Sequence, residues 1–192
     1  MEERLYSILT VSSAEKFNTS LKELLDKNRF SPVFFAFDVA GARRLLVERS
    51  FDIVIINAPL PDEFGTRLAL DICDSSGSGV LLLVKAEHYP DINARVSPYG
   101  VLTLSKPTGT QAVMQSLALL CSTRERLRKM EQKAASFEEK MEEIRIVNRA
   151  KWLLIEQLKM TESEAHRYIE KQAMDRCVTR KMIAESILST YK

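Results

Sequence analysis

The stretch that decides the fold is Phe51-Asp-Ile-Val-Ile-Ile-Asn57-Ala-Pro-Leu-Pro-Asp-Glu-Phe-Gly65. Its opening residues, Phe51–Ile56, form an apolar run rich in β-branched side chains, which is typical of a strand buried on both faces of a sheet. A helical pattern follows from Gly65 to Cys73. A buried strand followed by a helix is the repeating unit of a parallel sheet covered by helices, so this stretch indicates an α/β fold.

Segments of the same two kinds lie on both sides of this stretch. We predict further strands at Leu5–Val11, Pro32–Phe37, Val80–Val84 and Val101–Leu104, and further helices at Ser13–Leu25 and Ala40–Glu48. Residues 1–120 are therefore expected to form one α/β domain with a five-stranded parallel sheet and helices on both of its faces.

The composition changes after Thr110, because no Gly or Pro occurs from residue 111 to the end of the chain. Apolar residues then recur at alternating spacings of three and four, with Thr123 interrupting the pattern and Asn148 at its far end. This heptad pattern predicts a coiled coil over residues 117–148 that joins two copies of the chain. The alternative is a long helix that packs on its own α/β domain. The predicted seam is Leu120, Leu127, Met130, Ala134, Phe137, Met141 and Ile144.

Two further helices are predicted beyond Lys159. Thr161-Glu-Ser-Glu164 has the spacing of a capping box, in which the Thr161 hydroxyl accepts from the third helical amide and Glu164 reaches back. Thr179 is suited to cap a final helix. Residues 144–192 are thus expected to form a small three-helix unit. Its expected buried side chains are Leu158, Ala165, Tyr168, Ile169, Ala173, Met182, Ile183, Ser186 and Ile187.

The overall composition excludes several classes of site. Cys73, Cys121 and Cys177 are far apart, and His88 and His166 have no cluster of partners, so we expect neither a disulfide framework nor a metal site. No apolar run approaches the roughly 20 residues that span a membrane, and the start of the chain does not resemble a signal peptide, so a cytoplasmic protein is expected. Residues 1–110 hold 12 Lys/Arg and 14 Asp/Glu, whereas residues 111–192 hold 16 and 12, which favours an anionic partner in the second half.

The N-terminal domain resembles the receiver domain of two-component response regulators. After the strand that ends near Asn57, Leu60-Pro61 and Gly65 have the spacing of that family, and Lys106-Pro107 matches the pair at the end of its fifth strand. The resemblance covers about residues 4–120. It implies a flavodoxin-like, five-stranded parallel fold.

The same resemblance implies that the phosphorylation chemistry is lost. The position of the phosphoacceptor carboxylate is occupied by Asn57, and an amide is a poor nucleophile that offers no charge to Mg²⁺. The two acids that usually follow the first strand are replaced by Ser12 and Ser13. We therefore expect a pseudo-receiver, whose input would be an unidentified protein or ligand.

The remaining positions of the receiver site are also altered. The hydroxyl position at the end of the fourth strand falls at Val84 or Lys85, and the aromatic switch position falls at Thr103. Only Lys106 is retained. Without acids beside it, Lys106 is expected to be a structural or surface cation whose hydrogen bond Asn57 accepts.

The C-terminal part resembles the ANTAR domain, an RNA-binding antitermination module often carried by response regulators. The residues that carry the resemblance are Arg149-Ala150-Lys151, Leu154, Thr161-Glu-Ser-Glu164-Ala165, Arg167, Gln172-Ala173-Met174-Asp175 and Ile183-Ala184-Glu185-Ser186-Ile187. The sequence departs from the family at Trp152, where Gly usually follows the Ala-Lys pair, and it has a shorter segment before the capped helix. The resemblance implies RNA as the partner.

Phosphate-pairing cations in this region are candidates for RNA contact, although each taken singly is more typical of a solvated helix face. Trp152 and Tyr168 are candidates either for stacking on an unpaired base or for the core of the helical unit. The candidate cations are Arg149, Lys151, Lys159, Arg167, Lys171, Arg176, Arg180 and Lys181.

These patterns predict a non-enzymatic regulator of transcription antitermination that needs no cofactor. A parallel homodimer would present two ANTAR-type modules to two hairpin loops of a nascent transcript, and pairing the modules would raise the affinity. Two other functions stay open: a DNA-binding response regulator, and an adaptor that uses its coil and helices to bind a protein.

Overall fold

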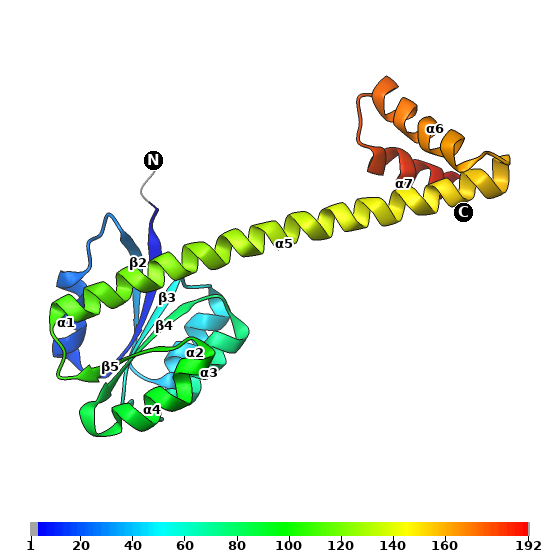
Figure 1. The fold of residues 1–192 in the computed structure, drawn as a ribbon. Helices are drawn as coiled ribbons and strands as arrows, with labels where there is room; N and C mark the ends of the chain where they lie inside the picture. Colours follow the sequence, from blue (N-terminus) through cyan, green and yellow to red (C-terminus); the bar gives the residue numbers. More distant parts are fainter. Residues whose placement is uncertain (1–3, 192) are drawn as a thin grey trace. The chain divides into compact units, whose positions relative to one another are not determined.

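The structure is a computed structural model that describes residues 4–191; residues 1–3, which were judged above not to resemble a signal peptide, lie outside this range. Five strands form one parallel sheet in the order β2-β1-β3-β4-β5 (Figure 1). This confirms the predicted fold class. The strands are β1 (Tyr6–Val11), β2 (Phe30–Ala36), β3 (Ile53–Asn57), β4 (Gly79–Lys85) and β5 (Leu102–Lys106).

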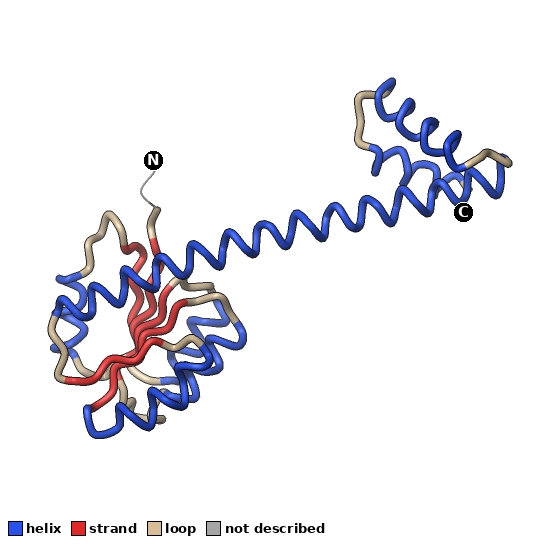
Figure 2. Tube along the Cα trace, viewed as in Figure 1, coloured by secondary structure: helices blue, strands red, loops and turns tan. Residues whose placement is uncertain are grey.

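Each face of the sheet is covered by its own helices, and each interface is a separate apolar core (Figure 2). One core contains side chains of α2 (Val39–Glu48), α3 (Thr66–Ser75) and α4 (Tyr89–Val96). The other contains side chains of α1 (Glu15–Leu24) and the beginning of α5. All five residues of β3 are buried, as expected of a strand with helices on both faces.

Helix α5 (Thr110–Leu158) is continuous for 49 residues. Its first turns belong to the α/β domain, where Leu117, Leu120 and Cys121 are buried against the sheet. Gly79 at the start of β4 allows this close packing, because a Cβ there would lie 3.2 Å from Leu120. Leu120 is therefore a core residue of its own domain and does not belong to an exposed seam.

Asp52, which directly precedes β3, also anchors α5. Its carboxylate accepts hydrogen bonds from the amide and hydroxyl of Ser7 and from the guanidinium of Arg128. Asp52 and Arg128 expose only 15% and 17% of their side chains. A charge at the beginning of a buried strand is thus tolerated because it is paired and hydrogen-bonded.

The chain divides into two compact units, residues 4–129 and 130–191, which are described separately. In the second unit the end of α5 packs with α6 (Glu162–Asp175) and α7 (Arg180–Thr190). The capping box is confirmed, since the Thr161 hydroxyl accepts from the Glu164 amide and the Glu164 carboxylate accepts from the Thr161 amide. Thr179 caps α7 by accepting from the Met182 amide.

The three-helix core differs in part from the predicted one. Ala165, Ile169, Ala173, Ile183 and Ile187 are buried as expected, together with Ala150, Leu154 and Ala184. The predicted burial of four other side chains is wrong, because the buried positions of the three helices are taken by alanine, leucine and isoleucine side chains. The exposed four are Leu158, Tyr168, Met182 and Ser186.

None of the helices within residues 4–191 combines the length and apolarity that crossing a membrane requires.

Candidate functional site

The ends of β1, β3 and β5 bring Ser12, Asn57 and Lys106 together. Lys106 Nζ donates to Asn57 Oδ1 at 2.7 Å and to the carbonyl oxygen of Ala58, and Asn57 Nδ2 donates to Ser12 Oγ at 3.0 Å. Ser12 is fully buried and Asn57 is 8% exposed. The side-chain amide of Asn57 therefore links the other two residues: its oxygen accepts from Lys106 and its nitrogen donates to Ser12.

Two lysines lie side by side at this edge of the sheet. Lys85 lies opposite Lys106 in the β4–β5 register, and burial together with the charge of Lys85 lowers the pKa of Lys106. The loop carboxylate of Asp62 accepts from the amides of Val39 and Ala40, and these bonds lower its pKa. Within the described part of the chain, no group of three or more His, Cys, Asp or Glu side chains is placed to hold a metal ion.

The other altered receiver positions are not part of this hydrogen-bonded set. Ser13 and Lys85 are exposed, whereas Val84 is buried in the apolar core. Thr103 is 5% exposed, and its hydroxyl has no hydrogen-bond partner among residues 4–191.

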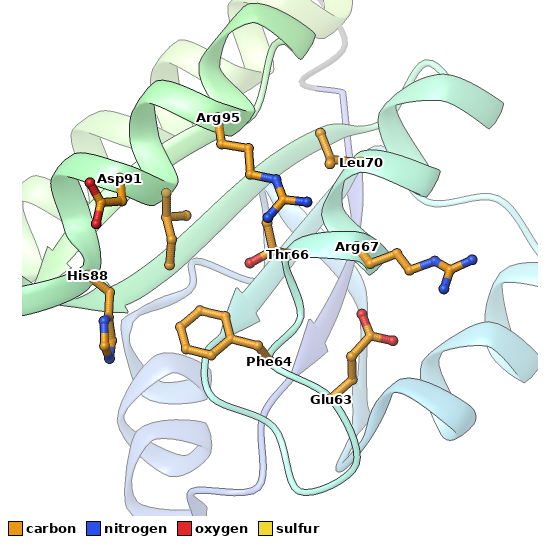
Figure 3. Close-up of a pocket in the computed structure, with 9 residues that line it drawn as sticks. Glu63, Phe64, Thr66, Arg67, Leu70, His88, Asp91 and Arg95 are labelled. Atoms are coloured by element: carbon orange, nitrogen blue, oxygen red, sulfur yellow. The ribbon is translucent and has the colours of Figure 1, made fainter.

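A cavity of about 580 Å³ lies between α3 and α4 (Figure 3). Its walls carry Arg67 on α3 and Arg95 on α4, and neither forms an ion pair with another described residue. Phe64 lines the cavity with its ring edge-on to His88, 5.7 Å between ring centroids. Figure 3 shows the Arg95 side chain extending from α4 toward Thr66. The sequence analysis did not identify this cavity, because its residues come from two helices and a loop.

In the second unit the candidate cations separate into paired and unpaired groups. Lys151 Nζ lies 3.1 Å from Glu162, and Arg180 lies 3.3 Å from Glu143 and 4.0 Å from Glu170. The other six show no ion pair with any residue in the described range. The unpaired six are Arg149, Lys159, Arg167, Lys171, Arg176 and Lys181.

Two of the unpaired cations lie one turn apart on α6. Arg167 and Lys171 are both exposed and are separated by four residues, so they lie on the same side of the helix. This side is opposite the buried Ala165, Ile169 and Ala173. The outer face of α6 thus carries two exposed cations that form no ion pair with another described residue.

A small groove with a volume of about 180 Å³ lies between the ends of α5, α6 and α7. Its rim carries Tyr168 and Tyr191, which are 39% and 38% exposed. Gln172 and Arg176 also line it, and both lack a side-chain partner among the described residues. Tyr191 was not predicted, because it follows the last helix and has no repeating pattern around it.

Trp152 does not lie in the three-helix core, since it is 70% exposed. The seam candidates that lie in this unit also remain uncovered in the single chain: Met130, Ala134, Phe137, Met141 and Ile144.

Residues 135–188 match the ANTAR domain family. The chain is 28% identical to the transcriptional regulatory protein PdtaR of Mycobacterium tuberculosis over 184 residues. This alignment covers 95% of the present chain and 89% of the relative.

Among solved structures, the signal receiver domain of an HD domain-containing protein from Pseudomonas fluorescens Pf-5 is 27% identical, with a TM-score of 0.59. The match covers 67% of the present chain and 95% of the solved receiver domain. A CheY-like response regulator receiver domain from Methylobacillus flagellatus is 20% identical with a TM-score of 0.53, covering 61% and 99%.

Proposed function

Because the chain joins a receiver-like domain to an ANTAR domain, we propose that it is a non-enzymatic regulator of transcription antitermination. Its ligands in this proposal are hairpin loops of nascent transcripts, bound by the C-terminal helices. The observation that carries the proposal is the match of residues 135–188 to the ANTAR family. Support comes from the relative that is named a transcriptional regulatory protein, because the alignment with it covers almost the whole of the present chain.

The outer face of α6 is the proposed contact for the RNA backbone. Arg167 and Lys171 have no acidic partner among residues 4–191, so no intramolecular ion pair must be broken before they neutralise phosphates. Arg176, which caps the C-terminal end of the same helix, lies on the other side of it and belongs to the groove. Lys151 and Arg180 are paired with carboxylates and are assigned to stabilising the helical unit.

The groove between the helices is the proposed site for an unpaired loop base. Tyr168 and Tyr191 present aromatic faces on which a base can stack, and such stacking is tolerant of sequence. Gln172 and Arg176 add hydrogen-bond donors that can read a base edge or hold its phosphate. These groups favour single-stranded loops over a uniform duplex.

The exposed apolar face of α5 is the proposed dimer seam. From Met130 to Ile144 it keeps the three-four spacing of a coiled coil and is not covered by other parts of its own unit. Two copies joined in this way would present two RNA-binding modules on one molecule.

The receiver-like domain is proposed to respond to a signal other than phosphorylation. Asn57, Ser12 and Ser13 supply no carboxylate, and Asn57 is held by Lys106 and Ser12. The cavity, lined by Arg67 and Arg95 together with the carboxylates of Glu63 and Asp91, is the proposed input site for a small phosphate-bearing anion. AMP and inorganic phosphate are suitable probes: we expect a thermal shift with the wild type and none with the double variant Arg67→Ala/Arg95→Ala. No shift with either probe would count against this input site.

Gel shifts with the full chain test the proposed function directly. Its expected ligand is an RNA hairpin with an unpaired loop, in preference to the same stem closed by a minimal loop and to duplex DNA of equal length. Arg167→Ala/Lys171→Ala is expected to weaken hairpin binding, with Lys22→Ala in the receiver-like domain as the control. Preference for duplex DNA would support a DNA-binding regulator instead, and no binding to either nucleic acid would support a protein adaptor.

A further inference from the structure

Trp152, the single tryptophan of the chain, points away from the three-helix core. It lies two residues after Ala150 and two before Leu154, and both of these are buried against α6 and α7. At about 3.6 residues per turn, two residues carry a side chain a little more than halfway round a helix. The indole is therefore directed opposite to the core, and 70% of Trp152 is exposed.

The heptad repeat alone would place Lys151, not Trp152, next in the seam after Ile144 and Asn148. The Lys151 side chain is instead turned toward α6, where its Nζ lies 3.1 Å from Glu162 and only 16% of the side chain is exposed. Trp152 follows Asn148 by four residues, and Asn148 follows Ile144 by four. A four-four spacing is a stutter, which compensates for the drift of a straight helix and keeps the stripe on one side.

We infer that Trp152 is the last apolar side chain of the α5 seam and is buried by Trp152 of a second copy in a parallel, in-register dimer. This inference rests on the dimer proposed above and extends it beyond residue 148. The stripe then has only one polar member, Asn148, between Met130 and Trp152. In the order of the chain it is Met130, Ala134, Phe137, Met141, Ile144, Asn148 and Trp152.

The second copy is the occupant that suits this stripe. An apolar stripe about one side chain wide is complementary to an identical stripe, whereas an RNA contact would require cations along it. Asn148 specifies the register, because in a parallel dimer its amide meets the same amide of the second copy and both can donate and accept. A polar residue at a single seam position is a known determinant of register and orientation.

The single tryptophan makes this inference directly measurable in the full chain. Emission and acrylamide quenching of Trp152 are followed through a dilution series whose dimer fraction is set by analytical ultracentrifugation. We expect the emission to shift to the blue and quenching to fall as the dimer forms. Phe137→Glu, which places a carboxylate in the seam, should keep the indole accessible at every concentration.

Sedimentation of substituted proteins provides the second measurement. Trp152→Ala is expected to raise the dimer dissociation constant by about tenfold or more, because a buried indole is among the largest apolar contacts available. Trp152→Phe should restore most of the affinity. Met174→Ala removes another exposed apolar side chain, on α6 and outside the stripe, and should leave the constant unchanged. Circular dichroism should show equal helix content in all three variants.

Two outcomes would overturn the inference and leave RNA binding intact. One is a dimer in which the indole stays as accessible as in Phe137→Glu. The other is an indole that becomes protected only when hairpin RNA is added, which would assign Trp152 to base stacking. A wild-type monomer at tens of micromolar would overturn this inference together with the proposed dimer.

Discussion

Both ends of the Asn57 side-chain amide are hydrogen-bonded. Its oxygen accepts from Lys106 at 2.7 Å, and its nitrogen donates to Ser12 at 3.0 Å. A carboxylate at this position would keep the first bond, but it could keep the second only if the Ser12 hydroxyl turned to donate, because an ionised Asp has no donor of its own. The serine and the asparagine thus fit each other as a pair. This fit explains how buried polar groups are accommodated after the acids of a receiver site are gone.

At this residue we predict an absence of phosphorylation. Small phosphodonors should leave no acid-labile phosphate on the wild type, and millimolar Mg²⁺ should cause no change in the NMR signals around Asn57. Asn57→Asp alone should also stay unlabelled, because Ser12 and Ser13 still provide no carboxylate for Mg²⁺. Stoichiometric labelling of the wild type, measured by mass spectrometry, would contradict the proposed pseudo-receiver.

The difference between paired and unpaired cations leads to a second prediction. Arg167→Ala and Lys171→Ala should each weaken hairpin binding and reduce the slope of log affinity against log salt by about 0.7 to 0.9, as expected for one lost phosphate contact. Lys151→Ala should change that slope little, because its ammonium is already paired with Glu162. Equal slopes for all three variants would mean that α6 does not face the phosphates.

At the scale of elements, the capping box of α6 should make the helical unit sensitive to acid. Hydrogen bonds from the Thr161 amide and hydroxyl lower the pKa of Glu164 below its ordinary value of 4.5. A lowered pKa means that the stabilisation is complete above pH 4.5 and is lost as the pH falls through the lower, folded value. Glu164→Gln should be less stable at neutral pH and should lack this part of the acid dependence.

The test compares thermal unfolding of the full-length wild type and Glu164→Gln at a series of pH values. The thermal stability of the wild type should fall toward that of the variant as the pH falls below 4.5. Thr161→Ala removes the other half of the box and should cost about 0.5–2 kcal/mol at neutral pH. Parallel pH curves for wild type and Glu164→Gln would show that the carboxylate does not contribute.

The same elements show how far sequence patterns can predict structure. All five strands were predicted with approximately correct ends, because buried parallel strands are nearly continuous apolar runs. Helix α4 was not predicted: Tyr89–Val96 is short, and only Val96 in it is fully buried. Periodicity also could not separate Leu120, which packs on the sheet, from the exposed Met130 and Phe137, since all three have the same spacing.

The candidate site was less predictable than the fold for the same physical reason. Cations and aromatic residues can be located in a sequence, but their partners lie on other helices. Lys151 is paired through Glu162 of α6, and Trp152 is exposed because Ala150 and Leu154 take the inner side of α5. The cavity between α3 and α4 and the rim residue Tyr191 required the folded chain.

At the scale of the whole molecule, the proposed dimer predicts a preference for paired hairpins. Two modules on one molecule make the second binding event intramolecular, which can raise the apparent affinity by about 10²–10⁴ when the linker between hairpins spans both sites. Wild type should therefore bind an RNA with two linked hairpins more tightly than either hairpin alone. Phe137→Glu should bind one hairpin normally and lose the preference, because it leaves each RNA-binding groove intact and disrupts only the seam. Filter binding at fixed salt, with a second RNA whose linker is too short to reach both modules, measures both effects. Equal affinity of the wild type for one and two hairpins would mean that each module acts alone, and would remove the functional reason for the seam.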